Sequence, residues 1–441
     1  MHPFPINRRE LLAAGGAAAL AGGPAFAAES PGRIDRSREG MVVSVSAAAS
    51  EVGRRLLAEG GNAVDAAVGV AFALAVVHPP AGNIGGGGFM MIHSPCCSPP
   101  VCIDYRERAP LKATRDMFAD GGDLHGHAMV GTPGTVAGLA LAHERLGKLP
   151  WKRLVEPAVH LAADGFPLEE SLAESLNEVL RDSPDHRELQ RVLGQSRERP
   201  WQAGDRLVQA DLAESLAQIG ARGADAFYKG EVAKKLVAEM QAGGGLISAE
   251  DLQGYRALLR RPIHASYRGF DLFGPPPPSS GGIVLKLALN ILGALPTDRH
   301  ERFAPQTLHL IVEVMRRAFC ERARSLGDAD FVDIPPRLTD KQYAVKLAKG
   351  IDLQRATPSA SLAPEIPLAG EGDNTTHFSV IDKDGLAVSN TYTLEQSYGS
   401  RIVVGGAGFL LNNEMGDFNW RAGRTDRNGR IGTPANLIAP G

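Results

Sequence analysis

Two strand-like segments near the C-terminal end of the chain, separated by a short turn, predict a β-hairpin. The segments span residues 375–381 and 386–394, and both are rich in β-branched and aromatic residues. Residues 382–385, with the sequence DKDG, lie between them. A three-residue loop with Gly385 in the left-handed conformation would join the strands and determine which residues face each other.

This register divides the hairpin into a hydroxyl-rich face and an apolar face, because facing residues on neighbouring strands share one side of a sheet. The polar pairs are Thr375 with Thr393, His377 with Thr391, and Ser379 with Ser389. The opposite face carries Phe378, Val380, Val388 and Tyr392. A sheet face lined with hydroxyl groups is unusual.

Thr375 stands at the start of the first strand, where a threonine can act as an N-terminal nucleophile. Its hydroxyl needs a base, and a free α-amine on the same residue can serve as that base. Residues 355–374 lack periodicity and contain small residues and prolines, so we expect exposed, mobile chain that can be cut between Asn374 and Thr375. From the hairpin alone, the alternative is that threonine is present only because it favours strands.

The rest of the chain mixes strand-like and helix-like segments. Residues 41–45 predict a strand, and residues 50–59 and 62–77 predict helices. Asn62 is a suitable N-cap for the second of these helices. Residues 138–240 have helical periodicity with charges on the exposed faces, as expected for a scaffold.

Two glycine-rich stretches interrupt these elements. Residues 85–88 are four consecutive glycines before a hydrophobic strand, and they permit close approach of backbone or ligand. A phosphate-binding loop is rejected because no Lys-Ser/Thr follows and the next element is a strand. Residues 274–282, GPPPPSSGG, fit either a flexible linker or an ordered turn. We favour the turn, because polyproline is stiff and a helix-like segment resumes at Ile283.

Composition limits the class of protein. The chain has 441 residues, of which 44% are hydrophobic, so it can bury a large core as two or three domains or one large unit. A formal net charge of -3 provides no basic excess, which argues against nucleic acid as a partner. The longest apolar run, residues 63–77, contains Asp65 and predicts a buried helix, so we expect no membrane span.

Residues 1–27 have the layout of an export signal. Arg8 and Arg9 precede an apolar stretch at residues 11–21, and small residues at Ala25 and Ala27 mark a cleavage site. The adjacent arginines fit a twin-arginine signal, and the alternative is an ordinary Sec-type signal with a coincidental arginine pair. Both interpretations predict a mature protein that is periplasmic or secreted.

Seven stretches of the mature sequence resemble, in order and spacing, those of the γ-glutamyltransferase (glutathione hydrolase) family. They are EGGNAVDAAV, NIGGGGFMM, DYRERAP, GTPGTVAG, PPPSSGG, TTHFSVIDKDG and GFLLNNEMGDF. The resemblance implies an α+β fold, the four-layer αββα sandwich of N-terminal-nucleophile hydrolases, in a precursor that cleaves itself. It also implies a large subunit from residues 28–374, a small subunit that starts with residues 375–441, γ-glutamyl substrates such as glutathione, and no cofactor or metal.

Through this resemblance, Thr375 is the expected nucleophile, and Thr393 is the residue that hydrogen-bonds its hydroxyl, in agreement with the hairpin register. Thr375 would attack the γ-amide carbonyl and form a γ-glutamyl ester, while its α-amine carries the proton to the leaving amine. Water or an acceptor amine would then release the γ-glutamyl group.

The same resemblance assigns the substrate-binding charges. Arg106 matches the arginine that holds the α-carboxylate of the γ-glutamyl group, and a guanidinium fork suits a carboxylate. Its alternative role is an ion pair with Asp104 or Glu107. Asp417 matches the carboxylate that accepts the substrate's α-amino group, with Glu414 beside it.

Two departures from the family pattern leave alternatives open. Glu395 stands where many members have asparagine, so it is a candidate for binding the substrate amine or altering specificity. The chain stops at Gly441, where the family continues into a serine pair and the glycines of an oxyanion hole, so we expect a fold that is incomplete at its C-terminus. Three hypotheses follow: a γ-glutamyl hydrolase or transferase, a related acylase that cleaves another amide, and a non-catalytic remnant that never matures.

Overall fold

Residues Glu39–Gly441 form one compact unit. The computed structural model describes residues 35–95, 97–195, 199–297, 301, 303–362, 375–420 and 434–441. The predicted export signal, Asn374 and the part of the predicted mobile segment from residue 363 onward lie outside the described residues. The described part of that segment ends in a short helix, α15 (Ser359–Leu362).

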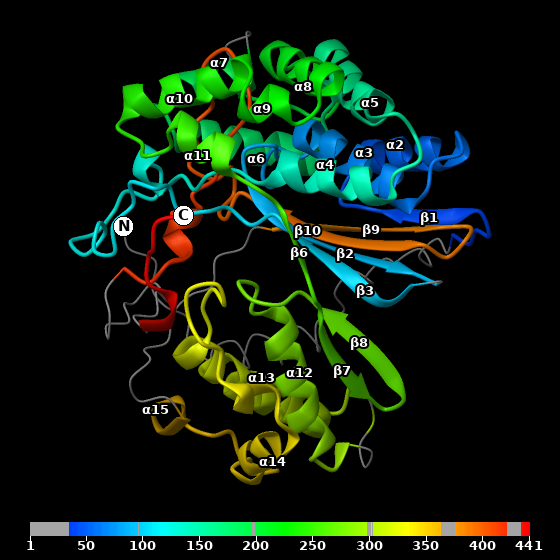
Figure 1. Ribbon diagram of the computed structural model, residues 1–441, viewed down its shortest axis with the longest axis vertical. Helices are drawn as coiled ribbons and strands as arrows, with labels where there is room; N and C mark the ends of the chain where they lie inside the picture. Colours follow the sequence, from blue (N-terminus) through cyan, green and yellow to red (C-terminus); the bar gives the residue numbers. More distant parts are fainter. Residues whose placement is uncertain are drawn as a thin grey trace, which may run out of the picture. The chain divides into compact units, whose positions relative to one another are not determined.

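A six-stranded antiparallel sheet organises this unit (Figure 1). Its strands lie in the order β1-β9-β10-β2-β3-β6, and each neighbouring pair is antiparallel. The bounds are β1 (Gly40–Val43), β2 (Gly87–Ser94), β3 (Cys97–Asp104), β6 (Leu258–Arg260), β9 (Thr376–Asp382) and β10 (Ala387–Thr393). The predicted hairpin is therefore an internal part of the sheet, with β1 on one side and β2 on the other.

The predicted register of the hairpin is confirmed. His377 pairs with Thr391, as the three-residue loop requires. Gly385 has a φ of 83°, which is the left-handed conformation that the turn needs. Asp382 is buried and accepts the backbone N–H of Leu386 at 3.0 Å, which closes the loop. The strands differ from the predicted bounds by one residue at their ends.

The two faces of the hairpin differ in burial. The apolar residues lie at 2% exposure or less and comprise Phe378, Val380, Val388 and Tyr392. The polar residues of the opposite face are exposed and comprise His377, Ser379, Ser389 and Thr391. Helix α3 (Ala63–Val77) packs against β9 and β10 on the apolar side, which explains the alternation along both strands.

Helix α3 has the cap that its sequence predicts. The Asn62 side chain accepts the N–H groups of Val64 and Asp65 at 2.9 and 3.0 Å, and Asp65 accepts the N–H of Asn62 in return. Every residue of α3 is buried. Its neighbours are α2 (Ala47–Ala58) and α5 (Trp151–Asp164), with the hairpin on the sheet side, so its sequence has no polar face.

The helical reading of residues 138–240 is confirmed, and these helices join α2 and α3 in a layer over one face of the sheet (Figure 1). The further helices between residues 127 and 254 are η1 (His127–Met129), α4 (Thr135–Leu146), α6 (Glu170–Arg181), α7 (Arg187–Leu193), α8 (Ala210–Arg222), α9 (Asp225–Tyr228), α10 (Glu231–Gly243) and α11 (Ala249–Gly254). A small two-stranded sheet joins β4 (Phe166–Pro167) to β5 (Arg206–Leu207).

A second group of elements has its own hydrophobic cluster on the other side of the sheet (Figure 1). It contains the hairpin β7 (Ile263–Tyr267) and β8 (Phe270–Gly274), and the helices α12 (Gly281–Gly293), α13 (Pro305–Ser325), η3 (Pro336–Thr339) and α14 (Lys341–Lys349). The proline-rich stretch before α12 is an ordered turn, as favoured, because Gly282 donates its N–H to the Pro275 carbonyl at 3.1 Å. The helix begins two residues earlier than predicted.

Some apolar surface stays exposed in this second group. Along one side of α13, Leu308, Val312, Met315 and Phe319 are each between 47% and 53% exposed.

The α+β fold class is confirmed, and the described residues form one large sheet, so they do not build the second sheet of a four-layer sandwich. None of the helices in the described ranges has both the length and the apolar character needed to cross a membrane.

Candidate active site

The two predicted catalytic threonines lie side by side at one end of the hairpin. Thr375 directly precedes β9, and Thr393 is the last residue of β10. Their hydroxyl oxygens are 3.5 Å apart. The Thr393 hydroxyl also accepts the backbone N–H of Glu395 at 2.9 Å. The register of the sheet thus brings the candidate nucleophile within hydrogen-bond distance of its candidate partner.

The four-glycine segment allows other groups to approach Thr393. Gly87 pairs with Thr393 across β2 and β10. A Cβ on Gly86 would lie 2.1 Å from the Thr393 carbonyl oxygen, and a Cβ on Gly87 would lie 2.5 Å from Oε2 of Glu107. Contacts this short leave no room for a side chain. Glycine at these positions therefore lets the end of β10 and the Glu107 carboxylate both approach this segment closely.

Arg106 follows β3 and is held in place through its backbone. Its N–H donates to Oδ1 of Asp104 at 2.9 Å, and its carbonyl accepts the hydroxyl of Tyr255 at 2.7 Å. Asp104 is fixed in turn by Nε of Arg260, which donates to Oδ2 at 2.7 Å. Asp104, one of the alternative partners predicted for the guanidinium, therefore holds the Arg106 main chain.

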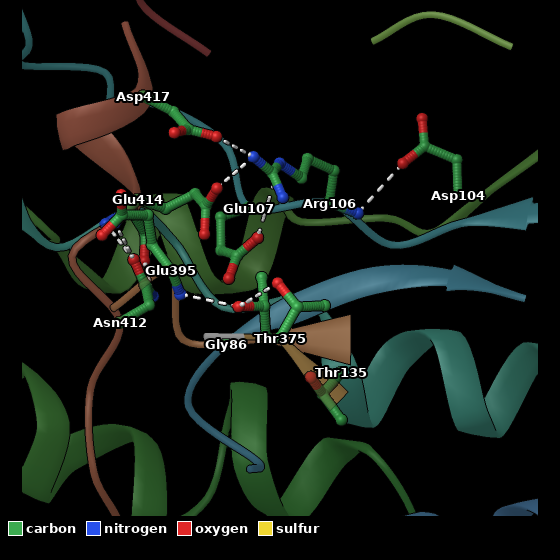
Figure 2. A network of polar contacts seen from close by, with 12 residues as sticks. Gly86, Asp104, Arg106, Glu107, Thr135, Thr375, Glu395, Asn412, Glu414 and Asp417 are labelled. Atoms are coloured by element: carbon green, nitrogen blue, oxygen red, sulfur yellow. Dashed lines mark hydrogen bonds and ion pairs between the residues drawn. The ribbon is translucent and has the colours of Figure 1, made fainter. Parts of the chain in front are cut away.

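The guanidinium of Arg106 faces three carboxylates, as Figure 2 shows. Nη2 contacts Glu414 and lies 2.5 Å from Oδ2 of Asp417. Nε lies 4.0 Å from Oε2 of Glu107. Glu414 and Asp417 are the first and last residues of the short helix η4 (Glu414–Asp417). The structure therefore brings together Arg106, Glu414 and Asp417, which are far apart in the sequence.

Asn412 connects η4 to the rest of this site. Its Oδ1 accepts the N–H groups of Gly131 at 2.9 Å and Glu414 at 3.1 Å. Its Nδ2 donates to the carbonyls of Gly85 and Gly131 at 2.8 Å each. Asn412 is fully buried, and all of its hydrogen-bonding capacity is used. Sequence reasoning missed this residue, although it lies within the NNEMGDF motif.

Burial and charge shift the pKa values of this cluster. The Glu107 side chain is 1% exposed, and its oxygens have no hydrogen-bond partner in any other described residue. Burial raises the pKa of Glu107 to about 7, against the opposing charge of Arg106. Burial also raises the pKa of Glu414, again opposed by Arg106. For Arg106 itself, burial lowers the pKa, but the three carboxylates outweigh burial and raise it.

Two residues have roles that the sequence alone did not resolve. The sequence predicts Glu107 only as an alternative ion-pair partner of Arg106. Its position next to Arg106 in DYRERAP is the sequence feature that indicates a place in the site. Glu395 has a φ of 79°, a left-handed conformation that is rare for a residue with a side chain. Its backbone N–H contacts the Thr393 hydroxyl, and its side chain lies on the side of Asn412 in Figure 2.

Arg106 and Glu107 also line a cavity of about 450 Å³, which Arg108, Tyr255 and Arg260 help to enclose. A cavity of this size can hold a small polar ligand. Within the described ranges, no group of His, Cys, Asp and Glu side chains is arranged to hold a metal ion.

The sequence profile of the gamma-glutamyltranspeptidase family matches residues 49–441. This chain belongs to the gamma-glutamyltranspeptidase family. The glutathione hydrolase proenzyme of Escherichia coli (strain K12) is 45% identical over 417 residues, which cover 92% of this chain and 71% of that protein. The resemblance seen in the sequence motifs is thus confirmed.

Solved structures support the same assignment of this gamma-glutamyltranspeptidase-family chain. The gamma-glutamyltranspeptidase of Helicobacter pylori matches with a TM-score of 0.72 and 39% identity, covering 78% of this chain and 100% of that chain. The cephalosporin acylase of Bacillus halodurans matches with a TM-score of 0.79 and 25% identity, covering 94% of this chain and 76% of that chain. The predicted α+β fold of N-terminal-nucleophile hydrolases agrees with both.

Proposed function

We propose that this member of the gamma-glutamyltranspeptidase family is a glutathione hydrolase that acts through an ester on Thr375. It cleaves the γ-glutamyl amide of glutathione and related compounds, and it passes the γ-glutamyl group to water or an acceptor amine. The observation that carries this proposal is the meeting of the Thr375–Thr393 pair with the cluster of Arg106 and Asp417 at one end of the sheet. The identity of 45% to a glutathione hydrolase proenzyme supports it.

The charged groups suit the α-carbon of a glutamyl substrate, which carries one carboxylate and one ammonium. Arg106 would bind the carboxylate through its guanidinium, while Asp417 and Glu414 would accept the ammonium. In the structure these groups contact each other. A bound zwitterion would replace that internal pairing with one contact of each sign, so both charges are needed for recognition.

The threonine pair would supply the chemistry. Thr375 Oγ1 attacks the γ-carbonyl carbon, its proton moves to its own α-amine, and Thr393 orients the attacking oxygen through the hydroxyl contact. The C–N bond then breaks as the α-amine returns the proton to the leaving amine. A water molecule attacks the carbonyl carbon of the resulting ester, the ester C–O bond breaks, glutamate is released, and the free threonine hydroxyl is regenerated.

Maturation would use the same hydroxyl. Thr375 attacks the carbonyl of Asn374, the peptide becomes an ester, and water opens the ester to leave Thr375 with a free amine. This step yields the large-subunit region of residues 28–374 and a second subunit that begins at residue 375. Residues 1–27 would direct export by a twin-arginine or Sec-type signal, which places the protein in the periplasm or outside the cell.

An acylase that cleaves a different amide is the second candidate. The match to a cephalosporin acylase over 94% of this chain and the acidic Glu395 beside Thr393 favour it. Among the solved structures, the acylase is 25% identical to this chain and the gamma-glutamyltranspeptidase of Helicobacter pylori is 39% identical, which makes the acylase the weaker candidate. The two candidates differ in whether the α-ammonium of the substrate is required.

The test compares the wild-type chain with Thr375→Ala by intact mass and denaturing gel. We expect two fragments from the wild type, the smaller beginning at Thr375, and one uncut chain from the variant. Hydrolysis of γ-glutamyl-p-nitroanilide is then compared with that of glutaryl-p-nitroanilide, which lacks the α-ammonium. Preference for the first substrate supports γ-glutamyl chemistry, and preference for the second supports the acylase. A wild-type chain that stays uncut and inactive would establish a non-catalytic protein.

A further inference from the structure

Asn83 is a buried polar residue that none of the steps above uses. It lies just before the four-glycine segment, and its exposure is 3%. An asparagine in such a position needs partners for two donors and two acceptor sites, because an unpaired buried polar atom is destabilising. Its contacts show what the side chain holds together.

The Asn83 side chain makes four hydrogen bonds. Its Oδ1 accepts the N–H of Gly86 at 2.9 Å and the hydroxyl of Thr135 at 2.7 Å. Its Nδ2 donates to the carbonyls of Ala81 and Thr393 at 2.9 Å each. The Gly86 N–H is only a donor and the two carbonyls are only acceptors, so the partners determine which way the amide points.

One of these hydrogen bonds holds the main chain of Thr393, which belongs to the threonine pair. The Thr393 carbonyl binds Asn83, while its hydroxyl lies 3.5 Å from that of Thr375 and accepts the Glu395 N–H. Gly86 makes this arrangement possible, because a Cβ there would lie 2.1 Å from the Thr393 carbonyl and 2.8 Å from Asn83 Oδ1. Asn83 therefore fixes the last residue of β10 at the point where the strand ends.

We infer that Asn83 is a positioning residue for both self-cleavage and turnover, acting through the backbone of Thr393. This inference rests on the proposed function of the threonine pair. Arg106 and Asp417, which would bind the substrate charges, do not contact Asn83. Loss of the Asn83 bond should therefore reduce the rate of attack by Thr375 and leave substrate binding nearly unchanged, which separates it from a defect in recognition.

Asn83→Asp is the primary test in the full chain. A carboxylate at this position turns both donors into acceptors, so the carbonyls of Ala81 and Thr393 would be repelled. We expect kcat on γ-glutamyl-p-nitroanilide to fall by at least about tenfold, KM to stay within about threefold, and the fragments to appear more slowly on the gel. The matched control is Asn177→Asp, because Asn177 binds the carbonyl and N–H of Trp201 at 2.9 and 2.7 Å away from this site.

A milder variant covers the case in which Asn83→Asp does not fold. Thr135→Val removes only the hydroxyl that donates a hydrogen bond to Asn83 Oδ1, and it keeps the shape of the side chain. The position is 0% exposed. We expect kcat to fall by about threefold with KM unchanged. An unchanged kcat in Thr135→Val and in a folded Asn83→Asp would overturn the inference.

Four further results would also count against it. The inference fails if Asn83→Asp and Asn177→Asp show the same ratio of loss in kcat to loss in Tm. It also fails if Asn83→Asp changes KM and not kcat. A wild-type chain that neither matures nor hydrolyses the substrate would overturn the proposed function and this inference with it. A mature, active wild type beside a fully active Asn83→Asp would overturn this inference alone.

Discussion

Two buried carboxylates in this protein have opposite surroundings. Glu313 in α13 is 1% exposed and accepts hydrogen bonds from Arg316 and Arg317 at 2.6 Å each and from the Thr357 hydroxyl at 2.5 Å. Glu107 is equally buried, but its nearest cation, Nε of Arg106, is 4.0 Å away. Its oxygens have no hydrogen-bond partner in another described residue. The first carboxylate is satisfied by the protein, and the second is not.

The pKa values follow this difference. Burial alone would raise the pKa of both groups. Hydrogen bonds from Thr357 and Arg317 reverse the effect and lower the pKa of Glu313 to about 2, whereas burial prevails for Glu107 and raises its pKa to about 7. A buried carboxylate with its hydrogen bonds satisfied stabilises structure, and here Glu313 attaches Thr357 to α13. A buried carboxylate without hydrogen-bond partners is characteristic of a site that binds ligands.

Glu313→Ala should have the largest effect on stability. It leaves Arg317, which is 5% exposed, as a buried charge without its carboxylate, and we expect a loss of about 4 kcal/mol in the free energy of unfolding. Denaturant unfolding measures this loss. The control is Glu231→Ala, which removes an exposed pair with Lys234 and should leave the free energy of unfolding nearly unchanged. Equal losses in the two variants would show that the Glu313 cluster is not a structural anchor.

Glu107→Gln should change how stability depends on pH. A carboxyl whose pKa rises from 4.5 to about 7 on folding binds its proton more tightly in the folded state. Its stabilising contribution is complete below pH 4.5 and is lost as the pH rises towards 7, by about 3 kcal/mol. The glutamine variant should lack this decline, which thermal unfolding at a series of pH values would detect. Parallel curves for the two proteins would mean that Glu107 is not the group that titrates.

Arg106→Ala should have its main effect on catalysis. Without the guanidinium, the α-carboxylate of the substrate loses a charge-assisted contact, and we expect kcat/KM for γ-glutamyl-p-nitroanilide to fall about 100-fold, or about 2.7 kcal/mol. Arg153→Ala is the control, because Arg153 is a half-exposed arginine of α5 that pairs with Glu59 at 2.7 Å and not with the carboxylate cluster. Similar losses in both variants would point to a general defect and not to the binding of one carboxylate.

Much of the fold was predictable where local patterns are sufficient. The DKDG turn determined the register of the hairpin, and Asn62 marked the start of α3, because turn and cap chemistry depend on a few adjacent residues. The hairpin made Thr375 only one of two readings, and the resemblance to a family was needed to make Thr375 and Arg106 candidate site residues. Their meeting with partners in distant segments depended on the resemblance to a family.

Other features could not be predicted because they depend on contacts between distant parts of the chain. Asn83 binds a carbonyl 310 residues away, and nothing adjacent to it in the sequence indicates that contact. The pairing of Arg106 with Glu414 and Asp417 likewise requires η4 to lie against the end of β3, which no local pattern specifies. The charge of a buried group such as Glu107 depends on what surrounds it in three dimensions.

Residues 85–88 leave little room for sequence drift. A Cβ on any of these four glycines would come within 2.1 to 2.5 Å of another atom, and a main-chain carbonyl oxygen is among those atoms at every position. A single substitution therefore has no neutral alternative, and change would require two strands and a distant loop to move together. We therefore expect these four glycine codons to change more slowly in evolution than the codons of surface residues.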